Sequence, residues 1–397
     1  MHSVGRVLGE VSGLLSRPPA ESVPVLDSLG RYSAETVVSS FKLPPAPKSV
    51  VDGYAVRAED VEPASPGAPV TLRLLEGVLR PGSTEGFELP RGSAVRVETG
   101  ALLPVGADAV VPVEDALEED GRVHLFRRVA RYENVSLPGE EYEEGVPIVR
   151  VGDRIQPHHL SALVLEGRSH VNVFRVEASI LNVGDEIVGG TYFRPFTHFL
   201  VASWLRSLGF RVTDVSVAPD SPEAVAEWAG SRGEWLVVIL GGTSMGGHDF
   251  TVKALESLGP EYIVHGLALQ PGKTACVAVK GGRLYLAASG LPVAALSTLE
   301  VFLRPLLRRV GLKVPLLPRV KARLTRRITV KAGVVGFARV RVYREGGTLL
   351  AEPVMLGGSG ALASLLRGNG YVIVPEGLEG YDEGEEVEVH LYGEVEE

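Results

Sequence analysis

Hydrophobic positions between residues 175 and 313 form short apolar runs that alternate with stretches of helical spacing. The runs "VEASILNV", "RVTDVSVA" and "EWLVVIL" predict strands, and "YIVHGLAL" and "ACVAV" predict two more. Between and after them, "FTHFLVASWLRSLG", "SPEAVAEWAGSR", "FTVKALESLG" and "VAALSTLEVFLRPLLRRVG" predict helices, the second opening with Ser221 followed by proline. This alternation is typical of an α/β domain with a largely parallel sheet.

The rest of the chain predicts three further parts. Residues 43–138 contain alternating or β-branched runs interrupted by Gly, Pro and Asp, which predicts a β-rich domain. Residues 314–397 begin within the proline-marked linker "KVPLLP", and the short strands beyond it predict a small β-barrel or sandwich. Residues 1–42 and 139–174 each contain a predicted helix, and we expect them to form one discontinuous domain into which the β-rich domain is inserted. The fold class is therefore multidomain, α/β and β.

Composition narrows the classes of function. The 397 residues carry a net charge of −9 without a block of basic residues, which argues against a nucleic-acid surface. The single cysteine, Cys276, excludes a disulfide framework and fits a reducing cytoplasm. The N-terminal helix carries Glu10 within its apolar stripe and does not resemble a signal peptide. No apolar run reaches the length of a membrane span, so we expect a soluble, cytoplasmic protein.

The stretch "ILGGTSMGGHDF" at residues 239–250 connects a predicted strand to a predicted helix. Its glycines allow positive φ angles and close approach of a ligand to the backbone. Asp249 is either the N-cap of the next helix or a carboxylate directed at a metal. A tight structural turn and a phosphate cradle both fit this loop. The candidate cradle residues are Gly241, Gly242, Ser244, Gly246 and Gly247.

Two other loops are expected at the same edge of the sheet. "NVGDEIVGG" offers Asp185 and Glu186 directly after a strand, and "LQPGKT" offers Lys273. Each has an ordinary explanation, because paired acids often cap helices and a lysine in a Pro-Gly turn is usually solvated. Together, an anion cradle, two acids and a cation fit a phosphate-bearing ligand with a divalent metal.

A set of motifs along the chain resembles the MoeA family, which includes the E domain of gephyrin. The motifs occur in family order and span nearly the whole chain: "S-x-x-DGYAVR" from Ser49, "TGA-x-x-P-x-GADAVV" from Thr99, "GE" at 139–140, "GDE" at 184–186, "GG-x-S-x-G-x-x-D" at 241–249, "PGK" at 271–273, "GLP" at 290–292 and "SG-x-L-x-SL-x-x-x-NG" at 359–370.

This resemblance implies four parts, among them a MogA-like α/β domain and a C-terminal β-barrel, in an elongated homodimer. It implies that molybdate, or tungstate, is inserted into adenylylated molybdopterin with Mg²⁺ and release of AMP, in a cleft between two subunits. A MogA-like adenylyltransferase is the implied partner. Carried over by position, the catalytic residues are Asp52, Glu186, Asp249 and Lys273, and the metal ligands are Asp185, Glu186 and Asp249. Thr99, Pro292 and the cradle residues would bind the substrate.

Several positions depart from the family pattern. Leu137-Pro138 replaces two arginines, Val183 replaces a threonine, and "GLPVAALS" lacks three residues of "GLPGNPVS". A catalytically impaired homodimer that acts as a binding or scaffolding protein is therefore an alternative of a different class. A MogA-like adenylyltransferase fits less well, because the flanking domains also match MoeA. The retained site residues favour the enzyme.

Overall fold

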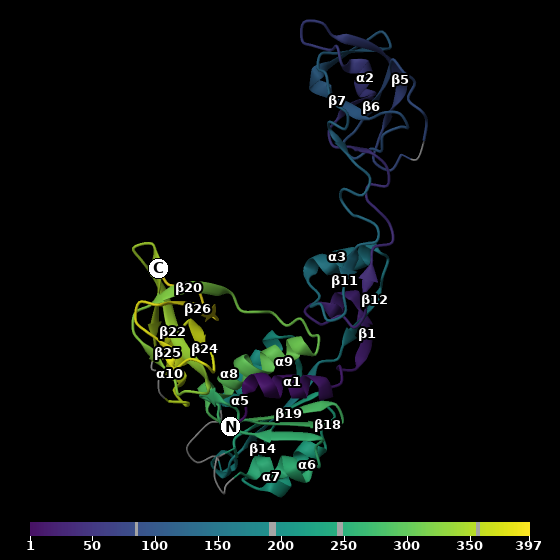
Figure 1. Ribbon diagram of the computed structural model, residues 1–397. Helices are drawn as coiled ribbons and strands as arrows, with labels where there is room; N and C mark the ends of the chain where they lie inside the picture. Colours follow the sequence, from purple (N-terminus) through teal and green to yellow (C-terminus); the bar gives the residue numbers. More distant parts are fainter. Residues whose placement is uncertain (84–85, 190–195, 244–248, 355–357) are drawn as a thin grey trace. The chain divides into compact units, whose positions relative to one another are not determined.

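The computed structural model describes residues 1–83, 86–189, 196–243, 249–354 and 358–397 (Figure 1). Contacts divide the chain into two compact units. One contains Met1–Glu35 and Val149–Glu397, and the other contains Thr36–Ile148. The four predicted domain ranges are finer than this division and stay predictions.

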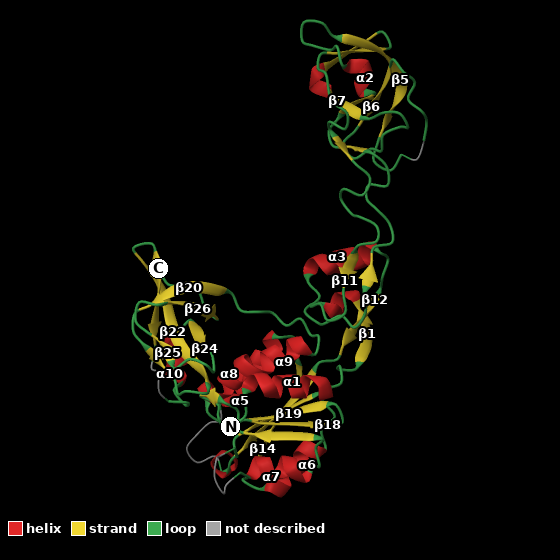
Figure 2. Cartoon of the chain, viewed as in Figure 1, coloured by secondary structure: helices red, strands yellow, loops and turns green. Residues whose placement is uncertain are grey.

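A six-stranded sheet forms the centre of the α/β domain, with the strand order β14-β13-β15-β19-β18-β16 (Figure 2). The first four strands in this order run parallel, whereas β18 and β16 are antiparallel to their neighbours. The strands are β13 Glu177–Val183, β14 Arg211–Ala218, β15 Leu236–Leu240, β16 Tyr262–His265, β18 Cys276–Lys280 and β19 Arg283–Ala288.

Strand β19 is absent from the sequence-based prediction, and its presence changes the sheet. It forms a hairpin with β18 that turns at Gly281 and Gly282, both of which have positive φ. A two-residue Gly-Gly turn favours such a hairpin. The largely parallel sheet is thus confirmed for four strands, and the hairpin makes the other edge antiparallel.

Helices cover both faces of this sheet (Figure 2). Buried residues of α1, α5, α8 and α9 pack on one face, and those of α6 and α7 on the other. The predicted long helix is interrupted by a π-helical segment between α8 and α9. The helical bounds are α1 Val4–Leu14, α4 Asp185–Val188, α5 Thr197–Ser207, α6 Pro222–Gly230, α7 Phe250–Ser257, α8 Pro292–Thr298, the π segment η3 Leu299–Leu303 and α9 Arg304–Arg309.

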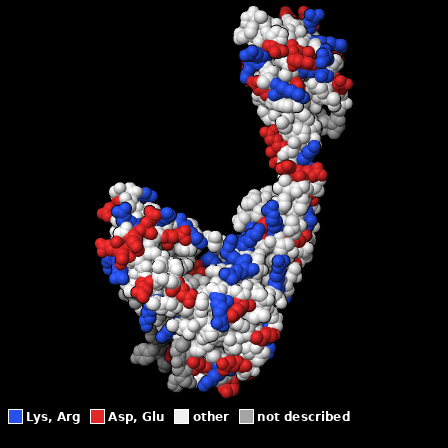
Figure 3. Space-filling view, viewed as in Figure 1, with Lys and Arg blue, Asp and Glu red and all other residues white. Residues whose placement is uncertain are grey.

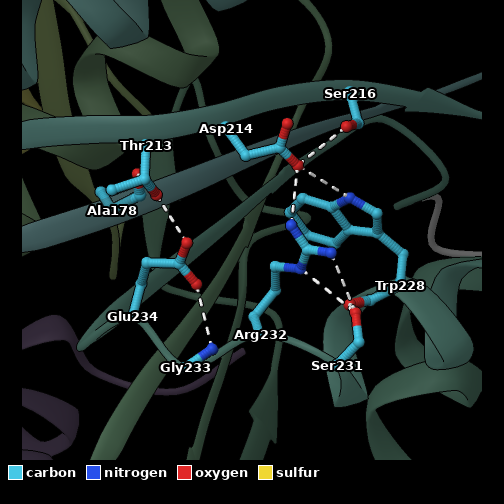
Figure 4. A network of polar contacts seen from close by, with 9 residues as sticks. All are labelled: Ala178, Thr213, Asp214, Ser216, Trp228, Ser231, Arg232, Gly233 and Glu234. Carbon is cyan, nitrogen blue, oxygen red and sulfur yellow. Dashed lines mark hydrogen bonds and ion pairs between the residues drawn. The ribbon is translucent and has the colours of Figure 1, made fainter.

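Polar side chains fasten α6 to the edge strand β14 (Figure 4). One carboxylate oxygen of Asp214 accepts hydrogen bonds from Arg232 at 2.9 Å and from the Trp228 indole at 3.2 Å. The Ser221 hydroxyl accepts from the Ala224 amide at 3.2 Å, which confirms the predicted N-cap. The helix therefore begins where its sequence predicts.

The N-terminal helix α1 packs on the α/β domain. Its stripe of Val4, Val7, Leu8 and Val11 is buried in the same core as the sheet, against α9 and η3. The Trp235 indole also donates to the Ser16 carbonyl at 2.7 Å. The predicted helical face is thus confirmed, and its apolar stripe is buried against the helices that cover the sheet.

A closed ring of five strands forms the C-terminal barrel, in the order β22-β23-β20-β26-β24 and back to β22. Strand β17, Leu269–Gln270, leaves the α/β domain and pairs with β22. The barrel core is apolar, and closure of the ring leaves none of its five strands at an open edge of the sheet. The bounds are β20 Arg319–Leu324, β22 Val335–Glu345, β23 Thr348–Pro353, β24 Gly370–Val374, β26 Glu386–Leu391 and helix α10 Leu362–Arg367.

The unit Thr36–Ile148 contains its own six-stranded sheet, ordered β7-β4-β6-β5-β9-β8. Acidic and basic side chains intermingle on the face of it that Figure 3 shows, and ion pairs join Arg91 to Glu59 and Arg127 to Glu133. The bounds are β4 Gly53–Val56, α2 Ala58–Val61, β5 Val70–Leu79, β6 Ser93–Val97, β7 Ala109–Pro112, β8 Ala116–Glu119 and β9 Arg122–Leu125.

Short elements complete the chain. Among the described residues, no helix is both long and apolar enough to cross a membrane. The predicted α/β and β multidomain fold is confirmed. The remaining bounds are β1 Ala20–Pro24, paired with β12 His170–Phe174, then η1 Val25–Ser28, β2 Val37–Val38, β3 Lys48–Ser49, η2 Val113–Asp115, β10 Val135–Ser136, β11 Pro147–Val149, α3 Pro157–Leu165, β21 Ile328–Thr329 and β25 Gly380–Tyr381.

Candidate functional site

The turn after β15 needs glycine at two positions. Gly241 has φ +96°, and a Cβ there would lie 2.4 Å from the Val183 carbonyl oxygen. Gly242 has φ +63°, and a Cβ there would lie 2.5 Å from the Thr251 hydroxyl. Both conformations and both close approaches exclude a side chain. The turn is therefore structurally constrained, and it also borders the cavity at this edge of the sheet.

A cavity of about 610 Å³ opens at the carboxyl ends of β13 and β15. This is where open α/β sheets bind ligands, and the volume suits a small organic molecule. Most of its wall is apolar, with polar groups that could orient a ligand. The apolar lining includes Val183, Ile187, Phe196, Leu240, Phe250, Leu291 and Pro292, and the polar lining includes Asn182, Glu186, Thr197, Asp220 and Thr243.

Carboxylates gather at one end of this cavity. Glu186 and Asp220 line it, and Asp185 begins helix α4 next to Glu186. The Asp220 amide donates to the Asp185 carboxylate at 3.1 Å, which joins the ends of β13 and β14. Within the described residues, no group of three or more His, Cys, Asp or Glu has the geometry of a metal site.

Asp249 stands at the N-cap position of α7, but its side chain makes no capping hydrogen bond. Asp249 thus occupies the position predicted for a helix cap, but the hydrogen bond expected of a cap is not formed. The metal interpretation stays a prediction. The predicted cradle residues Ser244, Gly246 and Gly247 lie outside the described residues.

A second cavity, of about 590 Å³, lies next to the first, because Thr243 and Leu291 line both. Lys273 lines this second cavity and is exposed. Lys331 and Ser359, from the barrel part of the same unit, line it too. The two cavities together offer an apolar space with carboxylates beside a space with two cations.

The loop that presents Lys273 is seated on helix α8. Gly272 has φ +119°, and a Cβ there would lie 3.0 Å from the hydroxyls of both Ser297 and Thr298. The Ser297 hydroxyl also donates to the Pro271 carbonyl. These contacts fix the backbone immediately before Lys273.

In the unit Thr36–Ile148, Asp52 and Thr99 interact directly. One carboxylate oxygen of Asp52 accepts from the Thr99 amide at 2.7 Å and from its hydroxyl at 2.8 Å. These hydrogen bonds, the backbone one foremost, hold the pKa of Asp52 below its usual value. The two residues that the sequence motifs single out here thus form one ionised, exposed hydrogen-bonded pair.

Comparison with known proteins identifies the family. Family models match residues 3–167 as the MoeA N-terminal region (domain I and II), 179–309 as a probable molybdopterin binding domain and 321–392 as the MoeA C-terminal region (domain IV). The molybdopterin molybdenumtransferase of Synechococcus elongatus is 32% identical over 386 residues, covering 93% of this chain and 94% of the relative. The chain belongs to the MoeA family.

Other MoeA relatives agree along the whole length. The molybdopterin molybdenumtransferase of Bacillus subtilis is 31% identical, over 94% of this chain and 90% of the relative. The crystal structure of a molybdopterin biosynthesis MoeA protein from Pyrococcus horikoshii superimposes with a TM-score of 0.80 at 31% identity, covering 99% of this chain and 100% of that one. The protein thus takes part in molybdenum cofactor biosynthesis as a MoeA-like transferase.

The structure of this MoeA protein adds residues that sequence reasoning missed. Asp220 and Asn182 line the first cavity, and Lys331 and Ser359 line the second. Asp220 follows the predicted strand "RVTDVSVA" at the same edge as the other candidate loops, so its position carried a usable signal. Ser359 opens the motif at 359–370, but no sequence pattern placed it or Lys331 beside the α/β domain, because only the tertiary fold brings them there.

Proposed function

We propose that this protein inserts molybdate, or tungstate, into adenylylated molybdopterin with Mg²⁺ and releases AMP. Membership of the MoeA family supports the coarser activity, that of a molybdopterin molybdenumtransferase in cofactor biosynthesis. The observation that carries the finer proposal is the pair of cavities that share Thr243 and Leu291. The first cavity, with its largely apolar lining, suits a substrate with an apolar ring system. The second cavity, which Lys273 and Lys331 line, suits a small anion.

The first cavity would hold the adenylylated substrate. Its apolar wall, including Pro292, would contact a ring system, and the Gly241–Gly242 turn would let a phosphate approach the backbone. The carboxylates at its end would repel that phosphate unless a cation lay between them. This is the chemical reason to place a divalent metal there.

The donor set fits Mg²⁺. This ion usually takes one or two protein carboxylates and completes its shell with water and substrate phosphate oxygens. Glu186 and Asp220 line the cavity and Asp185 adjoins them, so a preformed cluster of three carboxylates is not needed. Asp249 would join this set when substrate is bound. Bound Mg²⁺ would neutralise charge that develops on the phosphate oxygens.

Different residues would then orient the attacking water and bind the oxyanion. Glu186 would hold and orient the water that attacks the adenylate phosphorus; the new P–O bond forms on AMP, and the molybdopterin phosphate leaves as the pyrophosphate bond breaks. Lys273, and Lys331 across the same cavity, would hold the oxyanion by charge. Pyrophosphate cleavage depends on charge neutralisation and positioning, which is the chemistry these groups can supply.

The proposal also includes a homodimer and a MogA-like partner that supplies the adenylate. The ionised Asp52–Thr99 pair lies in a different compact unit from both cavities, and we propose that one subunit's pair completes the other subunit's site. Sedimentation at micromolar concentration should show a dimer. A monomer that still turns over substrate would exclude the shared site.

One assay tests the activity. The protein is incubated with the adenylate, Mg²⁺ and molybdate or tungstate, and AMP release is measured. Glu186→Gln should abolish release, whereas Glu227→Gln, which alters an exposed acid on α6, should leave it unchanged. If wild type releases no more AMP than Glu186→Gln with either oxyanion, the enzyme proposal fails, and a binding or scaffolding role takes its place.

Metal dependence has its own measurement. Calorimetry in the presence of the adenylate should show weaker Mg²⁺ binding for Asp249→Asn than for wild type. Unchanged affinity would remove Asp249 from the proposed metal site.

A further inference from the structure

Glu300 is a buried carboxylate held by donors from three elements. The side chain is 4% exposed, and the residue lies in the π-helical segment η3. Oε1 accepts from the Trp204 indole at 2.6 Å and from Arg304 at 2.9 Å. Oε2 accepts from Arg304 at 2.7 Å and from the Tyr371 hydroxyl at 2.8 Å. A charge this deeply buried is stable only when it is paired and hydrogen-bonded, so each donor matters.

The donors come from both sides of a boundary within the larger compact unit. Trp204 on α5 and Arg304 on α9 belong to the α/β domain, as Glu300 does. Tyr371 lies on β24 of the barrel, where the rings of Phe337 and His390 flank it at 4.4 and 5.0 Å. Tyr371 is the barrel's hydrogen-bond donor to this carboxylate in the described part of the chain.

The barrel is also attached near the second cavity. Strand β17 pairs with β22, and the Val335 amide donates to the Ala268 carbonyl at 2.8 Å. The Val293 amide, at the start of α8, donates to the Ser359 carbonyl at 3.0 Å. The Ser3 hydroxyl also donates to Glu376 at 2.7 Å, and Phe337 and Tyr371 of the barrel are buried in the core of the α/β domain. The Tyr371–Glu300 bond adds a directional attachment to a buried charge, which fixes the orientation of the barrel more closely than apolar packing does.

Orientation of the barrel matters for the second cavity because each part supplies a cation. Lys273 comes from the α/β domain and Lys331 from the barrel. Two ammonium groups that face one space repel when no anion lies between them. Something must hold the two parts together against this repulsion for the cavity to be ready for an oxyanion.

We propose that Glu300 is a positioning residue: through Tyr371 it holds the barrel so that Lys331 and Ser359 face Lys273 across the oxyanion cavity. This inference rests on the proposed function for the identity of the anion. The physical claim about barrel orientation does not, so the two can be tested apart.

The test compares three substitutions. Tyr371→Phe removes the barrel's hydrogen bond to Glu300. Tyr392→Phe is the matched control, because its hydroxyl donates to Leu365 within the barrel region and not to Glu300. Trp204→Phe removes a donor to the same carboxylate from within the α/β domain.

The first readout is hydrogen exchange of the Val293 and Val335 amides, which bond across the boundary. Both should exchange faster in Tyr371→Phe than in wild type and in Tyr392→Phe. This readout needs no substrate. Unchanged exchange in Tyr371→Phe overturns the positioning role whether or not the proposed function holds.

The second readout is the dependence of AMP release on molybdate. In Tyr371→Phe, KM for molybdate should rise about tenfold, the equivalent of one hydrogen bond to a charged group, while kcat at saturating molybdate stays within about twofold. Tyr392→Phe should keep the wild-type KM, and an equal rise in that variant would overturn the inference. Trp204→Phe keeps the Tyr371–Glu300 bond, so its KM should rise less than that of Tyr371→Phe; a larger rise would overturn the role of Tyr371. Absence of AMP release in wild type would count against the proposed function, and the exchange readout would still decide the positioning role.

Discussion

Replacement of Gly241 by alanine should destabilise the α/β domain and distort its cavity. The residue sits in the turn between β15 and α7, and the Thr251 hydroxyl donates to its carbonyl at 2.9 Å. Its φ of +96° is reached readily only by glycine. The added methyl group would point at the backbone of β13, which cannot move without disturbing the centre of the sheet.

The expected magnitude has two parts. A residue with a Cβ pays roughly 1–2 kcal/mol to adopt a left-handed conformation. The new Cβ would also lie 2.4 Å from the Val183 carbonyl oxygen, far inside a normal nonbonded contact. Overpacking of this kind usually costs about 1–3 kcal/mol. We therefore expect the free energy of unfolding to fall by about 2–5 kcal/mol.

Tryptophan fluorescence during urea unfolding measures this directly. All three tryptophans of the chain, Trp204, Trp228 and Trp235, lie on or beside elements of the α/β domain, so the signal reports this domain rather than the barrel or the inserted unit. The midpoint for Gly241→Ala should fall by about 1 M urea or more.

Gly233→Ala is the matched control. Gly233 belongs to the same domain, its φ is not positive, and a Cβ there would meet no atom within 4 Å. Its midpoint should stay the same or rise slightly, because alanine lowers the entropy of the unfolded chain. If Gly241→Ala unfolds at the same urea concentration as Gly233→Ala, the turn does not have the strained geometry described above.

Two further predictions concern single side chains. Thr99→Val removes the hydroxyl bond to Asp52 and keeps the amide bond, so the pKa of Asp52 should rise toward its usual value in a carboxyl NMR titration; an unmoved pKa would mean that the hydroxyl bond is not formed in solution. Because the folded-state pKa of Asp52 is the lower one, any stability it contributes is present above about pH 4 and is lost as the pH falls through the folded-state value. Cys276 is fully buried, and burial raises the pKa of its thiol to about 12, so a thiol reagent at pH 8 should label it only after denaturation; rapid labelling of the native protein would contradict the buried placement on β18.

Sequence patterns predicted a helix or strand correctly where neighbouring residues alone specify that element. The capping Ser221, the apolar run of β15 and the apolar stripe of α1 each specify an element without reference to the rest of the chain. Strand β19 is absent from the sequence-based prediction, although its Gly281–Gly282 turn is a hairpin pattern. The π-helical turn at Glu300 had no local pattern, because its geometry depends on partners far away in the chain.

The candidate site divides in the same way. Glu186, Gly241, Gly242 and Pro292 line the first cavity, since loops at one edge of a parallel sheet converge by topology. Lys273 lines the neighbouring cavity rather than this one. Lys273 is separated from the carboxylates because its loop is hydrogen-bonded to helix α8 through Ser297 and Pro271. The spacing of residues in the sequence does not predict this contact.

The burial of α1 has a consequence for how the chain is made. Residues 4–14 are synthesised well before helix α9, against which they pack and which follows roughly 300 residues later. The apolar stripe of α1 therefore stays without its packing partner during much of synthesis. The unit Thr36–Ile148 makes most of its contacts within itself, so it can fold before α9 has been made. In this order of synthesis, the apolar stripe of α1 has no packing partner on α9 or η3 until nearly all of the α/β domain has been made.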